Sequence, residues 1–274
     1  MKPEDIAAGL KLCRKANWNQ METDWQMFLE NSPEACLVAT FQEQIIGTVT
    51  TIKYQNSFSW IGMVLVDPDF QRQGIGMQLL NEALQILQKE KTVKLDATPQ
   101  GRAAYLKLNF LDEYRLSRMS IGSAKNINHA STARPIRKED LSLLIEFDSK
   151  TFGANRSSLL QLMWEKTPQY AFLIEENNEV KGYCMGRQGH DFIQIGPIIA
   201  ENANLAKNLL MAALENCMGQ PLILDVPHFE PEWLAWLRGI GFEEQRPFIR
   251  MYRGSNRIQG MPANQFAILG PEFG

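Results

Sequence analysis

The chain has 274 residues, of which 45% are hydrophobic and 22% charged. This ordinary composition excludes a disordered or collagen-like chain and supplies enough apolar surface for a buried core. Its 28 Lys and Arg residues against 31 Asp and Glu give a net charge of −3, without the basic excess of a dedicated nucleic-acid binder. We therefore expect a globular protein whose main partner is not nucleic acid.

Two further features restrict the class of protein. No run approaches the roughly 18 apolar residues of a membrane span, and the acidic start Met1–Asp5 differs from a signal peptide. We expect no membrane partner and a cytoplasmic location. The four cysteines are scattered and have only three histidines beside them, which favours neither a metal site nor a disulfide framework. We expect them to be reduced and mostly buried: Cys13, Cys36, Cys184 and Cys217.

The first half of the chain predicts three strands and then a helix. The strands are Ala35–Phe41, Ile45–Tyr54 and Ser59–Val66, and a turn at residues 42–44 joins the first two. Apolar residues at helical spacing follow: Ile75, Leu79, Leu80, Ala83, Leu84 and Leu87. This helix is predicted to cross over to a strand that contains Leu95 and Asp96.

The second half repeats this order. Strands are predicted at Ala171–Glu176, Val180–Arg187 and Phe192–Ala200, with a turn at residues 177–178. A crossover helix is marked by Leu205, Leu209, Leu210, Ala213 and Leu214, and it leads to Leu222–Pro227. Phe110 precedes Met119 by nine residues, and Phe242 precedes Met251 by the same nine. These matches indicate a divergent duplication.

The duplication divides the chain into two predicted domains, residues 1–122 and 133–274. The polar stretch 122–133 between them is typical of a linker. The last stretch, residues 254–274, is rich in glycine and proline, so we expect a loop and one closing strand there.

The segment after the third strand is the best candidate for a ligand site. Asp67-Pro68 breaks the strand, and a turn with Gly74 and Gly76 opens the helix, whose first amides have no intrahelical partner. Arg72 adds a positive charge, so the loop suits an anion such as a phosphate. The spacing matches neither GxxxxGK[ST] nor GxGxxG. A plain glycine turn that caps the helix is the structural alternative.

Residues 71–76, Gln-Arg-Gln-Gly-Ile-Gly, resemble the [QR]-x-x-G-x-[GA] loop of the GCN5-related N-acetyltransferase (GNAT) superfamily. The resemblance implies an α/β (α+β) fold of two tandem GNAT-like domains, each a mixed, mostly antiparallel central sheet flanked by helices. It implies acetyl-CoA as cosubstrate and no metal. The family's loop amides bind the pyrophosphate, and the preceding strand pairs with the pantetheine arm. The residues so implied are Val64, Leu65, Val66, Arg72, Gln73, Gly74, Ile75, Gly76 and Met77.

A second motif supports the resemblance. Residues 105–110 are similar to the family's Y-x-K-x-G-F, with Asn109 in place of the glycine, and Asn also enters the left-handed region. The resemblance implies that Tyr105 protonates the departing CoA thiolate, although a tyrosine packed at a helix end is an equal alternative. It also implies direct attack by an amine, with a backbone amide of the splayed strand stabilising the oxyanion. The base stays unassigned among Glu22, Asp24 and water.

The second copy lacks the features of such a loop. Residues 196–205 have lost the two glycines that correspond to Gly74 and Gly76, and they place Glu201 where a phosphate would lie; a carboxylate there repels an anion. Leu237 or Trp236 stands at the tyrosine position. We expect a degenerate domain. Asp148 and Arg156 are candidates for a substrate contact, but an ion pair between two elements is the favoured interpretation.

The leading hypothesis is an N-acetyltransferase that moves an acetyl group from acetyl-CoA to a small-molecule or peptide amine in the N-terminal domain. The alternative is a non-catalytic acyl-CoA-binding or sensing module, because no base stands out. An interaction scaffold without a cofactor ranks last, since it leaves the basic glycine loop unexplained. The sequence determines neither the acceptor nor the oligomeric state.

Overall fold

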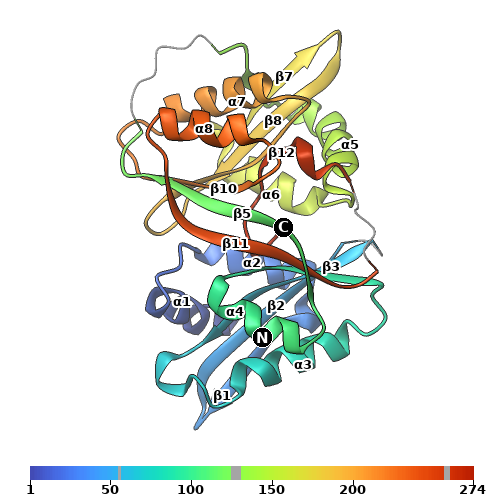
Figure 1. The fold of residues 1–274 in the computed structure, drawn as a ribbon, viewed down its shortest axis with the longest axis vertical. Coiled ribbons are helices and arrows are strands. Elements are labelled where there is room, and N and C mark those ends of the chain that lie inside the picture. The colour runs from blue at the N-terminus through green and yellow to red at the C-terminus, as the bar shows by residue number, and fades with distance from the viewer. Residues whose placement is uncertain (55–56, 125–130, 256–259) are drawn as a thin grey trace. The chain divides into compact units, whose positions relative to one another are not determined.

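A computed structural model describes residues 1–54, 57–124, 131–255 and 260–274. The chain forms two compact units (Figure 1). The first unit comprises Met1–Asp112, Met251–Asn256 and Glu272–Gly274, and the second comprises Glu113–Arg250 and Arg257–Pro271. The domain limits predicted from the repeat, 1–122 and 133–274, follow the duplicated sequence and stay a prediction. Residues 125–130 of the predicted linker lie outside the described residues.

The first unit is a mixed sheet with helices packed on it. Strands β1, β2 and β3 are antiparallel neighbours, β4 is parallel to β3, and β11 follows β4 in the strand order. Helices α1 and α2 pack on β2, and α3 packs on β1, β2 and β3. The elements are α1 (Ile6–Lys15), α2 (Glu22–Asn31), β1 (Leu37–Phe41), β2 (Gln44–Tyr54), β3 (Phe58–Val66), α3 (Ile75–Ile86), β4 (Thr92–Ala97) and α4 (Pro99–Lys107).

The second unit repeats the architecture. Strand β10 is antiparallel to β5 and parallel to β9, and β9, β8, β7 and β6 continue as antiparallel neighbours. Helix α7 packs on β7, β8 and β9. The elements are β5 (Leu111–Ile121), β6 (Arg134–Pro135), α5 (Leu141–Phe152), α6 (Ser157–Lys166), β7 (Phe172–Glu176), β8 (Glu179–Arg187), β9 (Ile193–Ala200), α7 (Ala203–Glu215), β10 (Leu222–Pro227), α8 (Pro231–Gly239), β11 (Glu243–Gly254) and β12 (Gln265–Ala267).

These elements confirm the strands and crossover helices that the repeat predicts, and β12 confirms the closing strand expected in residues 254–274. Both hairpin turns are two residues long with left-handed backbone, at Gln42 and Glu43 and at Asn177 and Asn178, which suits the twist of antiparallel strands. The predicted first strand is two residues too long, because residues 33–35 form a 3₁₀ turn and β1 begins at Leu37. Proline is favoured at the start of such a turn, since its φ is already fixed there.

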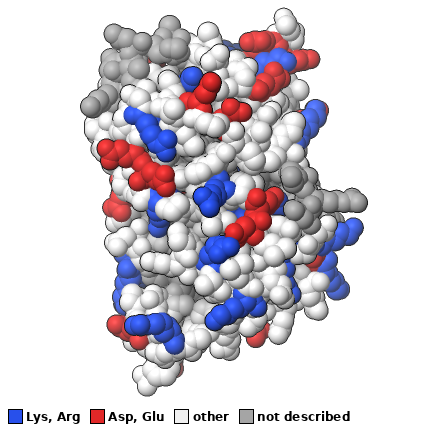
Figure 2. Space-filling view, in the orientation of Figure 1, with Lys and Arg blue, Asp and Glu red and all other residues white. Residues whose placement is uncertain are grey.

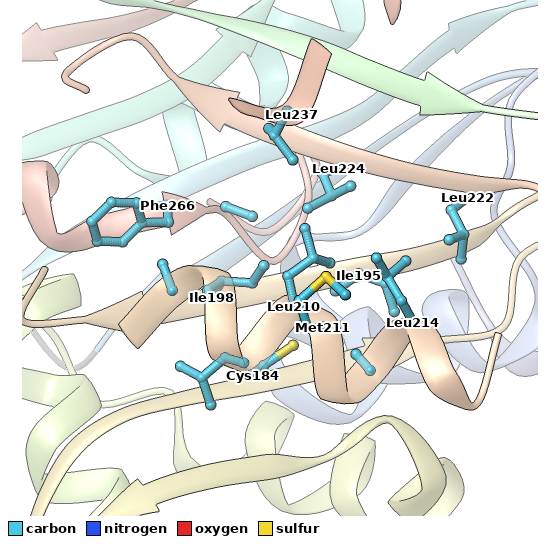
Figure 3. Close-up of a cluster of buried hydrophobic side chains, with 14 of the residues drawn as sticks. Cys184, Ile195, Ile198, Leu210, Met211, Leu214, Leu222, Leu224, Leu237 and Phe266 are labelled. Carbon is cyan, nitrogen blue, oxygen red and sulfur yellow. The ribbon is translucent and has the colours of Figure 1, made fainter. Parts of the chain in front are cut away.

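One apolar core joins the helices and strands of the second unit (Figure 3). Leu210 and Leu214 of α7 belong to this core together with Leu222 and Leu224 of β10, and all four are at most 4% exposed. Phe266 of β12 belongs to the same cluster. Burial of a leucine side chain contributes about 1.5–3 kcal/mol, so this core fixes β12 as well as α7.

Charges of both signs are interspersed on the face shown in Figure 2. Exposed ion pairs within a unit include Arg102 with Asp112 at 2.7 Å and Lys150 with Glu146 at 2.8 Å. Such pairs contribute at most about 1 kcal/mol each. None of the helices in the described ranges has the length and apolar character that crossing a membrane requires.

Candidate functional site

Side-chain contacts hold the segment that follows β3. Lys15 Nζ of α1 donates to both carboxylate oxygens of Asp67, at 2.7 and 2.9 Å, and lowers the pKa of that carboxyl. The Asp69 amide also donates to Asp67, at 3.3 Å. Gln71 Nε2 donates to the carbonyl oxygen of Val66 at 3.1 Å. The loop therefore leaves the strand in a defined direction.

The backbone of this loop turns sharply and leaves the first amides of α3 open. Arg72 and Gly74 have left-handed φ values of 60° and 86°, a conformation in which glycine is unstrained. Residues 71–74 are exposed, and residues 75–77 are partly exposed. The first backbone bond of α3 runs from the Gln78 amide to the Gly74 carbonyl, at 3.0 Å. The amides of residues 75–77 precede it and are left for a ligand or water.

Strands β3 and β4 separate beside this loop. They pair only where Ser59 is opposite Val93 and Trp60 is opposite Lys94, so residues 61–66 of β3 have no ladder partner in β4. We call this opening the first split. Val64 and Val66 are half-buried and Leu65 is 5% exposed. Because the strands are parallel, their carboxyl ends lie at one edge, where β3 leads into the loop and β4 into α4.

A β-bulge lies at the first split. Thr48 of β2 pairs with Leu65 and Thr50 pairs with Gly62, so two residues of β3 oppose one of β2. Met63 in the bulge has a left-handed φ of 50°, and its carbonyl accepts the Thr48 hydroxyl at 2.8 Å. Bulges next to active sites redirect backbone groups, and this one turns β3 where it diverges from β4.

Tyr105 lies on α4, directly after the second strand of the split. Its side chain is half-buried, and its ring packs edge-on against Phe110 with centroids 6.0 Å apart. Desolvation raises the pKa of Tyr105 to about 12, so the phenol carries its proton at neutral pH. Asn109 has a left-handed φ of 62°, which confirms the role predicted for it in place of glycine. The geometry is compatible with a proton donor.

The cysteines are poor candidates for a covalent acyl carrier. All four are buried and free, which confirms that part of the prediction. Burial raises the pKa of Cys13 to about 12 and that of Cys36 to about 11, and it also raises those of Cys184 and Cys217. Because the thiolate is the nucleophilic form, these side chains are unreactive at neutral pH.

The corresponding loop of the second unit is closed by its own side chains. The Asn202 side chain accepts the Leu205 amide at 3.1 Å and caps α7. Glu201 is exposed, and Lys181 Nζ contacts it at 3.3 Å. An amide at this helix start is thus already bonded, and the carboxylate predicted to repel an anion lies beside it.

The strands of the second unit also separate, but the chain fills the gap. Strands β9 and β10 pair only at Ile193 with Leu222 and at Gln194 with Ile223. Beyond that point β12 pairs with β9, and the Ile268 amide donates to the Asp225 carbonyl of β10 at 2.9 Å. We call this opening the second split. Segment 265–269 lies where a ligand would have to pair with β9.

Buried polar side chains anchor that segment. Arg187 donates to the Leu269 carbonyl at 2.6 Å. Gln194 donates to Asp225 at 2.8 Å, and Arg118 donates to both oxygens of Asp225, also at 2.8 Å. The four side chains are at most 6% exposed. Asp225 therefore has a structural role, since it joins two buried side chains.

Asp148 and Arg156 form a buried ion pair at 2.8 Å, and both are at most 2% exposed. The Tyr183 hydroxyl donates to Asp148 at 2.5 Å, and the Arg156 guanidinium lies over the Phe152 ring at 4.0 Å. This arrangement is the structural alternative that the sequence favoured over a substrate contact.

Sequence reasoning missed the role of Arg118, although Met119 beside it is one of the residues that mark the repeat. It also missed the filling of the second split. Within the described residues, no group of three or more His, Cys, Asp or Glu side chains is arranged to hold a metal ion.

Two models of known families match the chain. The model described as "Acetyltransferase (GNAT) family" matches residues 10–110, and that described as "Acetyltransferase (GNAT) domain" matches residues 144–267. The chain therefore belongs to the GNAT family of acyltransferases and carries two GNAT domains in tandem.

Known relatives span nearly the whole chain. It is 26% identical to a holothin acyltransferase of a Pseudoalteromonas species, over 94% of this chain and 87% of that protein. It is 24% identical to the uncharacterized N-acetyltransferase YitH of Bacillus subtilis, over 99% and 96%. The crystal structure of a candidate acetyltransferase from Pyrococcus horikoshii superposes with a TM-score of 0.86 at 25% identity, covering 100% of this chain and 94% of that one.

Proposed function

We propose that the chain transfers an acetyl group from acetyl-CoA to a primary amine, in the first unit. The observation that carries this proposal is the difference between the two splits. The first has an exposed loop with open helix amides, whereas Gln265–Ala267 pairs with β9 in the second. One unit can thus receive an extended ligand that ends in phosphates, and the other holds a segment of the chain itself.

In this proposal the pantetheine arm pairs with residues 64–66 of β3, which lack a ladder partner in β4. Buried backbone amides and carbonyls require hydrogen bonds, and the amide groups of pantetheine supply them. The pyrophosphate lies at the amides of residues 72–77, with Arg72 adding positive charge. Gly74 keeps the approach open, because no heavy atom lies within 4 Å of a Cβ built there.

The chemistry is direct attack by the amine on the thioester carbonyl carbon. A backbone amide near the Met63 bulge stabilises the oxyanion, and Tyr105 gives its proton to the departing thiolate. The raised thiol pKa values disfavour a route through an acyl-cysteine. The acceptor is a small molecule or a peptide with a primary amine.

The test is a calorimetric titration with acetyl-CoA, followed by an assay of CoA release with phenethylamine, cadaverine and a lysine-containing peptide. We expect one site per chain, lost in Gly74→Glu and kept in Gly219→Glu. Gly219 is a matched control in the second unit, since it also has a left-handed φ and open space around a built Cβ. Binding without transfer to any amine would favour an acyl-CoA sensor, and two sites per chain would refute the assignment to one unit.

A further inference from the structure

The segment Glu272–Gly274 belongs to the first unit and packs inside it. The Tyr54 hydroxyl of β2 donates to the Phe273 carbonyl at 2.6 Å. The Phe273 ring stacks on that of Phe28 in α2, with centroids 4.5 Å apart and planes 9° from parallel. Glu272 is 4% exposed and Phe273 is fully buried. The buried contacts of Phe273 therefore hold the backbone of Glu272 in place.

The strand register places this segment beside the bulge at the first split. Thr50 pairs with Gly62, and Tyr54 pairs with Phe58, so the four side-chain positions share one face of the β2–β3 ladder. A Cβ built on Gly62 would lie 2.6 Å from the Glu272 carbonyl oxygen. The backbone of Glu272 thus contacts the residue next to Met63, where β3 diverges from β4.

Two observations indicate that this side of the site is polar and charged. Thr50 Oγ1 is buried without a hydrogen-bond partner among the described residues. Cys13 of α1 responds to the charges around it: burial contributes most to its raised pKa, Arg14 opposes the rise, and Glu272 and Asp24 add to it. The negative charges of Glu272 and Asp24 are therefore both close enough to Cys13 of α1 to raise its pKa.

Two other acidic residues, Asp24 and Glu22, lie on α2. Asp24 accepts the Met21 amide at 2.6 Å and caps α2. Glu22 is exposed at the start of the same helix and accepts the side-chain amide of Gln26 at 3.2 Å. Of the three acidic residues, Glu272 is the one whose backbone contacts the strand at the first split.

We propose that Glu272 is the general base of the transfer reaction, which rests on the function proposed above. Its carboxylate takes one proton from the acceptor's ammonium and later passes it to water. The freed lone pair forms the C–N bond, and the C–S bond breaks as the tetrahedral intermediate collapses. The nitrogen then releases a second proton, which balances the one that Tyr105 gives to the thiolate.

The test compares Glu272→Gln with Glu272→Asp and with Glu30→Gln, an exposed glutamate of α2. CoA release is measured with phenethylamine, which is cationic at pH 7, and with hydroxylamine, which is largely uncharged. We expect Glu272→Gln to lower kcat with phenethylamine by about a hundredfold and with hydroxylamine by less than threefold. Its kcat should no longer fall on the acidic side of the pH profile. Glu272→Asp should recover part of the rate, and Glu30→Gln should match the wild type.

Acetyl-CoA affinity and the melting temperature of each variant show whether the fold and the cofactor site are intact. Equal losses with both amines, or an unchanged acidic limb in Glu272→Gln, would overturn the role of Glu272 and leave the acetyltransferase function standing. Loss of the acidic limb in Asp24→Asn alone would assign the base to Asp24 instead. A wild-type chain that binds acetyl-CoA and acetylates neither amine would refute the proposed function and this inference together.

Discussion

Two substitutions of Gly74 distinguish the effect of backbone strain on stability from the effect of an added charge on affinity for acetyl-CoA. Gly74 is the N-cap of α3, with φ 86° and ψ −5°, and a Cβ built there meets no heavy atom within 4 Å. Gly74→Ala therefore costs only the left-handed backbone strain, about 1–2 kcal/mol of unfolding free energy. Gly74→Glu has the same strain and adds a carboxylate at the start of the helix.

The added charge determines the loss of affinity. A carboxylate about 5 Å from one phosphate charge repels it by about 1.7 kcal/mol at an effective dielectric constant of about 40, and a pyrophosphate carries about two such charges. The expected loss is about 3 kcal/mol, or roughly a hundredfold in Kd. It should shrink as salt is added, because exposed charges are screened.

Calorimetric titration with acetyl-CoA and thermal unfolding of both variants measure the two effects separately. Both variants should lose similar stability, while only Gly74→Glu should lose most of its affinity. Equal affinities of the Ala and Glu variants for acetyl-CoA would refute the placement of the pyrophosphate at this loop.

Three further predictions concern single contacts. Tyr105→Phe should lower kcat about a hundredfold without changing the calorimetric affinity for acetyl-CoA, and full activity would exclude the acid role. Arg118→Met leaves the buried Asp225 carboxylate unpaired, so urea unfolding should show a loss of about 3–5 kcal/mol, part of which the added change Asp225→Leu restores; additive losses would contradict that coupling. The Lys15 ion pair lowers the pKa of Asp67, so its stabilisation exists above the ordinary Asp pKa and disappears as pH falls through the lowered one. Lowering the pH from 7 to 3 should therefore reduce the free energy of unfolding of the wild type more than that of Lys15→Met. Parallel curves of unfolding free energy against pH would show that the pair contributes nothing.

The elements that the sequence predicts well are those with local signals. Strand β2 and helix α3 alternate or repeat their apolar residues at the required spacing, and both hairpin turns fall where polar residues interrupt the pattern. The loop at residues 71–76 is also local, because its left-handed positions and open amides follow from a few neighbouring residues. Each of these features is determined within about a dozen residues.

The features that the sequence did not predict depend on distant residues. The sequence predicts a closing strand in the last stretch but not its partner, because β12 is only three residues long and β9, with which it pairs, lies more than sixty residues earlier. The Arg118–Asp225 pair joins residues 107 positions apart. Glu272 has no motif around it, and its contact with Gly62 follows only from the folded chain. Contacts between distant residues that belong to no periodic pattern or motif cannot be predicted from the amino-acid sequence alone.

The two splits give the duplication a physical meaning. Diverging parallel strands leave backbone amides and carbonyls without ladder partners, and buried groups of this kind must be satisfied. In the second unit β12 satisfies them permanently, and Gly196 permits the approach, since a Cβ there would lie 2.1 Å from the Ile268 carbonyl oxygen. In the first unit, residues 64–66 of β3 have β2 on one side and no ladder partner in β4 on the other among the described strands, so in the proposed function a ligand supplies the bonds on that side. Under the proposed function, a repeat of one architecture thereby yields one stable support and one site that receives acetyl-CoA.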